Sequence, residues 1–155
     1  MKQMFCGHTT LKEALTNKFK SFNVEKTCEH CKKMEEHVCE VKFMTFPKQL
    51  IFVLDRFSSD REKIDHFVQY YPEIEMKTLC DFYQDCGYPG NTGIDQKTYK
   101  LNAVVLHSGG CWGGHYTAYV KDENGIEWNC DDSYVSQRQI DYDDQRAYVI
   151  SYSLE

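Results

Sequence analysis

The spacing of apolar residues predicts one short helix near the start of the chain. In residues 9–20, leucine or phenylalanine recurs every four positions, so the apolar side chains form a single stripe. Thr9 or Thr10 can cap the start of this helix, and Glu13 follows Thr10 at the spacing of a capping box. We therefore expect an amphipathic helix that packs through its apolar stripe.

The rest of the hydrophobic pattern is typical of β-strands. Residues 36–46 alternate loosely, and the continuous apolar run at 50–57 is typical of a buried strand. Four segments of the C-terminal half are rich in β-branched and aromatic residues, at 99–107, 115–121, 127–135 and 147–154. Asn124-Gly125 marks a tight turn between two of them. These segments predict an antiparallel meander.

Glycine and proline mark the connections between these elements. Residues 81–97 hold the densest turn signals of the chain and predict an exposed loop. A second, glycine-rich loop is expected at 108–114, with the sequence SGGCWGG. We find no internal repeat and no linker, so the 155 residues predict one domain.

Composition excludes several classes of protein. Hydrophobic residues make up 41% of the chain and charged residues 27%, which is typical of a soluble globular domain rather than a disordered or fibrous chain. No run approaches the roughly 18 apolar residues of a membrane span, and the N-terminus does not resemble a signal peptide. We therefore expect a cytoplasmic or nuclear protein that does not bind a membrane.

Charge narrows the choice of partner. The net charge of −6 argues against nucleic acid, because domains that bind phosphates are usually basic. Residues 1–50 carry nine Lys and Arg against six Asp and Glu, whereas residues 51–155 carry nine against eighteen. The acidic part can attract a basic ligand, although such an excess often marks only a solvated face.

Eight cysteines are many for a chain of this length. Without a secretion signal, a disulfide framework is the weaker interpretation. Reduced thiols, a metal site or thiol chemistry are the remaining alternatives, and composition does not decide among them.

Two short segments near the C-terminus carry candidate chemistry. Gly113-Gly114-His115-Tyr116 and Asp131-Asp132-Ser133 lie on segments that a tight hairpin joins, so His115 and Asp131 can lie side by side. A histidine base needs such a carboxylate to fix its tautomer and stabilise its imidazolium form. The alternative is a histidine at a strand edge beside a turn carboxylate.

The C-terminal segments resemble the signature of the ubiquitin-specific proteases, a papain-like family of cysteine deubiquitinases. The matching text is YKLNAVVLHSG at 99–109, GGHYTAYV at 113–120, Trp128, DDSYV at 131–135 and AYVISY at 147–152. Upstream, PKQLIFVLDRF at 47–57 resembles the family strand that ends in Arg-Phe. Cys28-Glu-His-Cys31 resembles a fingertip cysteine pair, so the resemblance covers about residues 9–154.

The resemblance implies an α+β fold, a mostly antiparallel sheet with the palm and fingers of a papain-like protease. The fingers are expected at about 22–46 and the palm at about 47–155. The helical thumb of the family is largely absent from these 155 residues. Residues 1–155 are thus expected to form a partial catalytic domain, which exposes an apolar face unless a partner covers it.

The resemblance also implies roles for individual residues. His115 corresponds to the general base, Asp131 to the residue that orients it, and Asp132 to a neighbour that shares this role in some members. His107, Gly113, Gly114 and Tyr116 correspond to the narrow channel for the Gly-Gly tail of ubiquitin. His107 can alternatively be a strand histidine with satisfied hydrogen bonds. Because ubiquitin's tail is rich in arginine, the acidic part of the chain has a candidate ligand.

The family's nucleophilic cysteine lies in a box that this sequence does not contain. Three alternatives follow: the chain is part of a longer enzyme or receives the box from another chain, it is an inactive ubiquitin-binding relative, or Cys111 serves as the nucleophile. The third is the weakest, because Cys111 precedes His115 in the same loop, whereas a reactive thiolate is usually made at a helix N-terminus. We expect deubiquitination, with ubiquitin or a ubiquitinated protein as partner and this chain inactive by itself.

Cys28 and Cys31 have the spacing of half a tetrahedral zinc site. The second half can come from two of four other residues, Cys6, His8, His37 and Cys39, with His30 also nearby. The alternative is two free thiols at the tip of a two-stranded finger. One structural zinc ion is the cofactor that this pattern implies.

Overall fold

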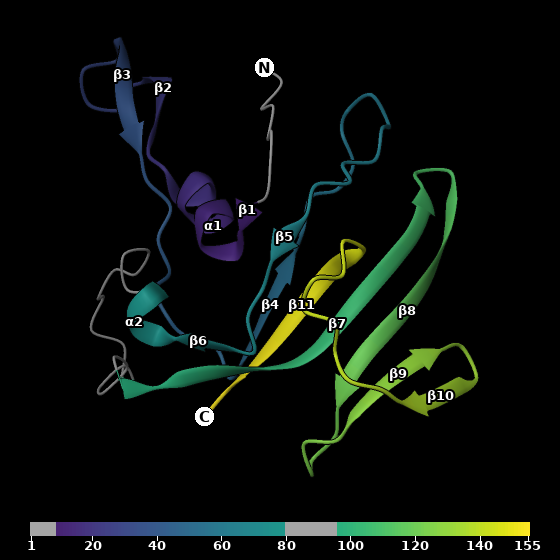
Figure 1. Cartoon of the computed structure of the whole chain (residues 1–155). Coiled ribbons are helices and arrows are strands. Elements are labelled where there is room, and N and C mark those ends of the chain that lie inside the picture. Colours follow the sequence, from purple (N-terminus) through teal and green to yellow (C-terminus); the bar gives the residue numbers. More distant parts are fainter. Residues whose placement is uncertain (1–8, 80–95) are drawn as a thin grey trace.

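The computed structural model describes residues 9–79 and 96–155 of the chain. Its main element is a strongly twisted antiparallel sheet, with the helices on one side and a separate hairpin projecting beyond them (Figure 1). The expected α+β fold with mostly antiparallel strands is confirmed. The expected loop at 81–97 lies almost entirely outside the described residues.

The main sheet has the strand order β10-β9-β8-β7-β11-β4. These strands are β4 (Gln49–Val53), β7 (Thr98–Gly110), β8 (Gly113–Lys121), β9 (Glu127–Asp131), β10 (Tyr134–Gln137) and β11 (Ala147–Leu154). A short strand, β6 (Glu73–Glu75), pairs with the start of β7. The predicted meander is present as β7 to β10, and β11 returns to the other side of β7.

The predicted N-terminal helix is present as α1 (Leu11–Phe19). Thr10 caps it, and Glu13 completes the predicted capping box: the Glu13 amide donates to Thr10 Oγ1 at 3.1 Å, and the Thr10 amide donates to Glu13 Oε2 at 2.8 Å. The strand β1 (Thr9–Thr10) pairs in parallel with β5 (Val68–Gln69). Neither α1 nor the short α2 (Met76–Leu79) is long and apolar enough to cross a membrane.

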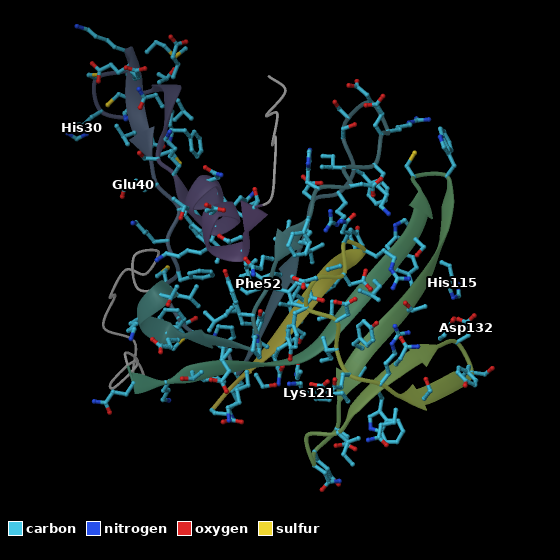
Figure 2. The ribbon with its side chains drawn as sticks, viewed as in Figure 1. His30, Glu40, Phe52, His115, Lys121 and Asp132 are labelled. Carbon is cyan, nitrogen blue, oxygen red and sulfur yellow. The ribbon has the colours of Figure 1, made fainter. Side chains whose placement is uncertain are left out.

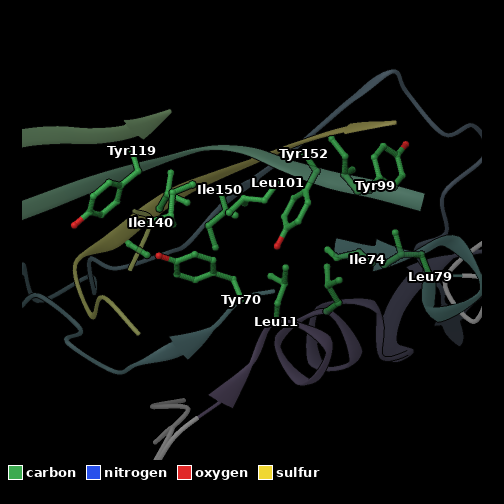
Figure 3. Close-up of a cluster of buried hydrophobic side chains, with 14 of the residues drawn as sticks. Leu11, Tyr70, Ile74, Leu79, Tyr99, Leu101, Tyr119, Ile140, Ile150 and Tyr152 are labelled. Carbon is green, nitrogen blue, oxygen red and sulfur yellow. The ribbon is translucent and has the colours of Figure 1, made fainter. Parts of the chain in front are cut away.

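The core lies between the sheet and α1 (Figure 3). Its largest fully buried side chains include four tyrosines, which need partners for their hydroxyl groups. Main-chain carbonyls supply these partners for three of them, since Tyr70, Tyr99 and Tyr152 donate to Asp141, Pro47 and Tyr71. Burial raises the pKa of Tyr99 to about 12. These three hydrogen bonds fix the orientation of Tyr70, Tyr99 and Tyr152 in the core.

The projecting hairpin consists of β2 (Phe22–Thr27) and β3 (Met34–Cys39), which form a sheet of their own. The strand predicted at 36–46 is wrong in its bounds, because β3 begins at Met34 and ends at Cys39. Cys39 pairs with Phe22, the first residue of β2, so the residues after it have no strand beside them in this hairpin.

Three further sequence predictions need correction. The apolar run at 50–57 is not buried on both faces: β4 is an edge strand, with Ile51 58% and Val53 63% exposed. The segment 108–114 is mostly strand, because β7 and β8 continue through its glycines. The segment 127–135 is two strands, because Asp132 and Ser133 form a turn between β9 and β10.

One apolar row crosses the face of the main sheet that points away from the core. The strand register places its six residues opposite one another, in the order Val53, Val149, Val105, Ala118, Cys130 and Val135. Residues directly opposite each other in a sheet lie on the same face. No member of this row is fully buried by the described residues.

Candidate functional site

The predicted histidine and carboxylate meet at the outer half of the main sheet. His115 lies on β8 and Asp131 ends β9, the strand next to it. His115 Nε2 is 2.5 Å from Asp131 Oδ1, so the two side chains share a hydrogen bond. Figure 2 shows His115 directed toward the turn that carries Asp132. The hairpin β8–β9 thus brings together the two residues that the sequence analysis paired.

The pair is open to solvent and is polarised by its own charges. The side chains of His115 and Asp131 are 52% and 47% exposed. The hydrogen bond and the charge of Asp131 raise the pKa of His115 above its usual value, and the more distant charge of Asp132 acts in the same direction. The ring is therefore a stronger base than an ordinary histidine side chain.

Asp132 lies beside the pair but makes a different contribution. Its φ of +50° places it in the left-handed region, which suits the tight turn before β10 and which aspartate tolerates better than most residues. Ligand atoms of His115, Asp131 and Asp132 all lie within 4.8 Å of one another. Asp132 thus adds negative charge, while the hydrogen bond comes from Asp131.

A shallow hollow of about 330 Å³ lies at the end of the β7–β8 hairpin. Its lining contains all four residues predicted to hold a glycine tail, namely His107, Gly113, Gly114 and Tyr116. Gly114 is required by the packing: a Cβ there would be 2.3 Å from His107 Nε2 and 2.4 Å from the Ser108 carbonyl. A Cβ on Gly113 would meet nothing within 4 Å.

Two aromatic residues to which the sequence analysis gave no role, Phe57 and Tyr148, also contact His107. The rings of Phe57 and Tyr148 are centred 5.6 Å and 6.0 Å from that of His107, and Tyr116 is 4.7 Å away. His107 is 2% exposed, and its Nδ1 has no hydrogen-bond partner in the described part of the chain. The described residues therefore do not support the alternative that both ring nitrogens of His107 have hydrogen-bond partners.

The tip of the same hairpin is held by a neighbouring loop. The thiol of Cys111 donates to the main-chain carbonyl of Arg61 at 2.8 Å, and the Arg61 guanidinium lies 4.7 Å from the centre of the Trp112 ring. Arg61 also has a positive φ of 61°, which fixes the turn of its loop. The Cys111 thiol is thus bonded to this loop and not to His115.

The candidate metal residues lie at the tip of the projecting hairpin, far from His115 in Figure 2. Ligand atoms of Cys28, Cys31 and Glu35 lie within 4.8 Å of one another. The main-chain amides of Cys31 and His30 lower the pKa of the Cys28 thiol, and the Cys31 thiol adds to this effect. Two sulfurs and a carboxylate suit zinc in chemical type. The sequence analysis did not consider Glu35, although it lies four residues after Cys31.

The other residues considered for this site are not brought to it. His37 and Cys39 pair with Val24 and Phe22, at the opposite end of the hairpin from the Cys28–Cys31 turn. Cys6 and His8 lie outside the described residues.

Comparison with known proteins connects this geometry to one family. The family model described as ubiquitin carboxyl-terminal hydrolase matches residues 2–152. Ubiquitin carboxyl-terminal hydrolase 9 of Arabidopsis thaliana is 33% identical over 131 residues, which cover 81% of this chain and 13% of that protein. The human ubiquitin carboxyl-terminal hydrolase 17-like protein 15 is 38% identical over 111 residues, 70% of this chain and 18% of that protein.

Solved structures show the same fold. A SAGA DUB module bound to monoubiquitin is similar with a TM-score of 0.76 at 21% identity, and the match covers 95% of this chain and 33% of that one. The yeast SAGA DUB module gives a TM-score of 0.75 at 23% identity, with the same coverage. The chain therefore spans about a third of these structures and less than a fifth of the two curated relatives.

Proposed function

The chain belongs to the ubiquitin carboxyl-terminal hydrolase family, and on that basis we propose that it takes part in thiol-dependent hydrolysis of the bond after the C-terminal glycine of ubiquitin. The observation that carries the proposal is the hydrogen bond between His115 Nε2 and Asp131 Oδ1. In this role the chain is a palm with fingers: the segment at about 22–46, which contains the projecting hairpin, is the finger part, and residues 47–155 form the palm.

The geometry supports different roles for the two ring nitrogens of His115. With the Nε2 hydrogen donated to Asp131, His115 Nδ1 is the nitrogen that can take the proton of a thiol. The thiolate attacks the glycine carbonyl carbon, and the imidazolium then gives its proton to the leaving amine. Water hydrolyses the resulting thioester with His115 again as base. Asp131 orients the ring throughout, and Asp132 adds to the negative charge beside it.

The nucleophile comes, in this proposal, from a further segment or chain that carries the cysteine box. The outer sheet face with the apolar row defined above is a second contact surface for the rest of that assembly. Two residues beyond Val105 and Ala118 on that face, His107 pairs with Tyr116 in the wall of the hollow. His115 pairs with Ser108, one position along, and therefore points to the opposite face of the sheet, so the cysteine has to reach His115 from that opposite face.

We assign the hollow to the glycine tail of ubiquitin. Its wall combines glycines, which leave room for a main chain, with the aromatic rings of Phe57 and Tyr116. The buried His107 Nδ1 is a spare hydrogen-bonding atom in that wall. Residues 51–155 carry twice as many acidic as basic side chains, which favours a basic tail.

A ubiquitin probe with a C-terminal vinyl sulfone tests the activity. We expect an adduct in the assembly that contains both this chain and the cysteine box, and none when His115→Ala is introduced. His66→Ala, which removes an exposed histidine outside the site, should react normally. Unchanged labelling of His115→Ala would refute the base. Ubiquitin binding without any adduct, in every assembly, would instead identify an inactive ubiquitin-binding module.

We further propose one structural zinc ion bound by Cys28 and Cys31, with Glu35 as the third ligand. The support is the closeness of the three donor groups at the finger turn. Zinc titration against a chromophoric chelator should give one ion per chain, and Glu35→Gln should weaken its binding. Glu36→Gln is the matched control, because Glu36 accepts a hydrogen bond from Asn23 and is not part of the cluster. A stoichiometry well below one would refute the site.

The proposed compartment is the cytoplasm or the nucleus. Five described cysteines form no disulfide, namely Cys28, Cys31, Cys39, Cys111 and Cys130. Reducing compartments maintain such thiols. Cell fractionation of the tagged protein would test this placement.

A further inference from the structure

Arg56 is a buried charge whose hydrogen bonds, among the described residues, go to main-chain carbonyls. It follows β4 and is only 3% exposed. Its Nε donates to the Ala147 carbonyl at 2.6 Å, and its Nη1 donates to the carbonyls of Ile64 at 3.0 Å and His66 at 2.6 Å. Nη2 has no partner in the described part of the chain. Burying a charge is costly, and this cost is offset by the three main-chain carbonyls to which the guanidinium donates. Removal of the guanidinium would therefore release the chain segments around residues 64–66 and 147 together.

The contacts of Arg56 are adjacent to the residues that surround His107. Phe57 directly follows Arg56, and Tyr148 directly follows Ala147, whose carbonyl the guanidinium holds. The rings of Phe57 and Tyr148 both contact His107, and they contact each other with centres 6.2 Å apart. One side chain thus joins the two chain segments that carry these rings.

Arg56 also fixes the loop that reaches His107 from the other side. The Ile64 amide donates to the Arg56 carbonyl at 2.7 Å, so residue 64 is held by both the main chain and the side chain of Arg56. Lys63, beside it, pairs with Phe57 and donates from Nζ to the His107 carbonyl at 3.0 Å. The position of Lys63 therefore depends on the Arg56 contacts.

We propose that Arg56 is a positioning residue that sets the shape of the hollow around His107. It acts through the main chain of Ile64 and Ala147 and does not itself line the hollow. The specificity consequence rests on the proposed function: if the hollow holds the glycine tail of ubiquitin, Arg56 determines how well that tail is recognised.

The test compares two forms of ubiquitin, full-length and lacking the last two glycines. Arg56→Met keeps most of the side-chain volume and removes the guanidinium. We expect it to weaken binding of full-length ubiquitin by roughly tenfold to a hundredfold, as displaced binding groups do, and to leave binding of the shortened form unchanged. Tyr99→Phe is the control, because it removes a buried hydrogen bond to the Pro47 carbonyl near the opposite end of β7. It should preserve the preference for full-length ubiquitin.

A second readout separates this inference from the proposed function. Arg56→Met should shift the ¹H–¹³C NMR signals of the His107 ring, and Tyr99→Phe should not. Arg56→Lys keeps the positive charge but removes the planar guanidinium, and it should shift the same signals. This variant replaces Arg56→Met if Arg56→Met fails to fold. Unmoved signals would overturn the role of Arg56, and so would equal loss of affinity for both ubiquitins if the unsubstituted chain prefers the full-length form. Moved signals in a chain that never distinguishes the two ubiquitins would support Arg56 and refute the tail site.

Discussion

At the scale of single residues, the state of His115 depends on one hydrogen bond. We predict that Asp131→Asn lowers the pKa of His115 toward its ordinary value of 6.5, because it removes both the bond and the charge that raise it. Asp132→Asn should lower this pKa less, since Asp132 acts only through its charge. An NMR titration of the ring signals measures both shifts. A larger effect of Asp132→Asn would show that Asp132, and not Asp131, orients His115.

The same interaction couples the charge of His115 to stability. Because the folded-state pKa is raised, the contribution of the imidazolium is fully present below the unfolded value. It is lost as pH rises through the raised folded-state value. Deprotonation also produces the free base, so turnover in an active assembly should rise over this same pH range.

Gly114 offers a residue-scale test of the hollow. Gly114→Ala should destabilise the chain by about 1–3 kcal/mol, the usual cost of overpacking, because its Cβ would overlap His107 Nε2 and the Ser108 carbonyl. Gly113→Ala should change stability by less than about 0.5 kcal/mol, since its Cβ meets nothing within 4 Å. Urea unfolding of the two variants measures the difference. Equal stabilities would contradict the described packing of His107.

The sequence predicts contacts in this site only between residues that lie close together along the chain. His115 and Asp131 were paired correctly because a short hairpin joins them. Phe57 and Tyr148 were missed because they lie far apart in sequence. A register shift between Ala147 and Val149 also leaves Tyr148 as an extra residue in β11. Regular alternation along a strand does not reveal such a bulge.

At the scale of elements, α1 was predicted well because its signals are local. The capping box and the apolar stripe act within a few residues, and both are present. The strand β4 was predicted with too much burial, because its apolar run does not say whether another strand or helix covers its second face. Strand ends likewise depend on the partner: β3 ends at Cys39, opposite the first residue of β2.

The cap of α1 can be tested directly. Thr10→Ala should destabilise the protein by about 1 kcal/mol, the typical cost of losing an N-cap side chain. Thr16→Ala is the control, because Thr16 is exposed within α1 and donates only to the Lys12 carbonyl of the same helix. It should leave stability unchanged or slightly raised, since alanine favours helix. Thermal unfolding compares the two. A Thr10→Ala variant as stable as Thr16→Ala would mean that β1 pairing alone fixes this end of the helix.

At the scale of the whole molecule, the main sheet has two unlike faces. One carries the core with its buried tyrosines (Figure 3). The other carries the apolar row, which crosses six of the seven strands from Val53 to Val135. Composition could not reveal this asymmetry, because it follows from the strand order and from the return of β11 beside β7. An apolar face of this kind usually marks a site of interaction.

The exposed ends of the row provide the last prediction. Val53→Thr with Val135→Thr should reduce the binding of an apolar fluorescent dye such as 1-anilinonaphthalene-8-sulfonate and reduce self-association at high concentration. Both side chains are more than half exposed, so stability should change by less than about 1 kcal/mol. Tyr134→Ser is the control, because Tyr134 is 69% exposed on the same strand as Val135 but points to the other face. If Tyr134→Ser lowered dye binding as much as the double variant, the apolar row would not be the surface that the dye detects. It would then lose its standing as a contact face for the rest of the assembly.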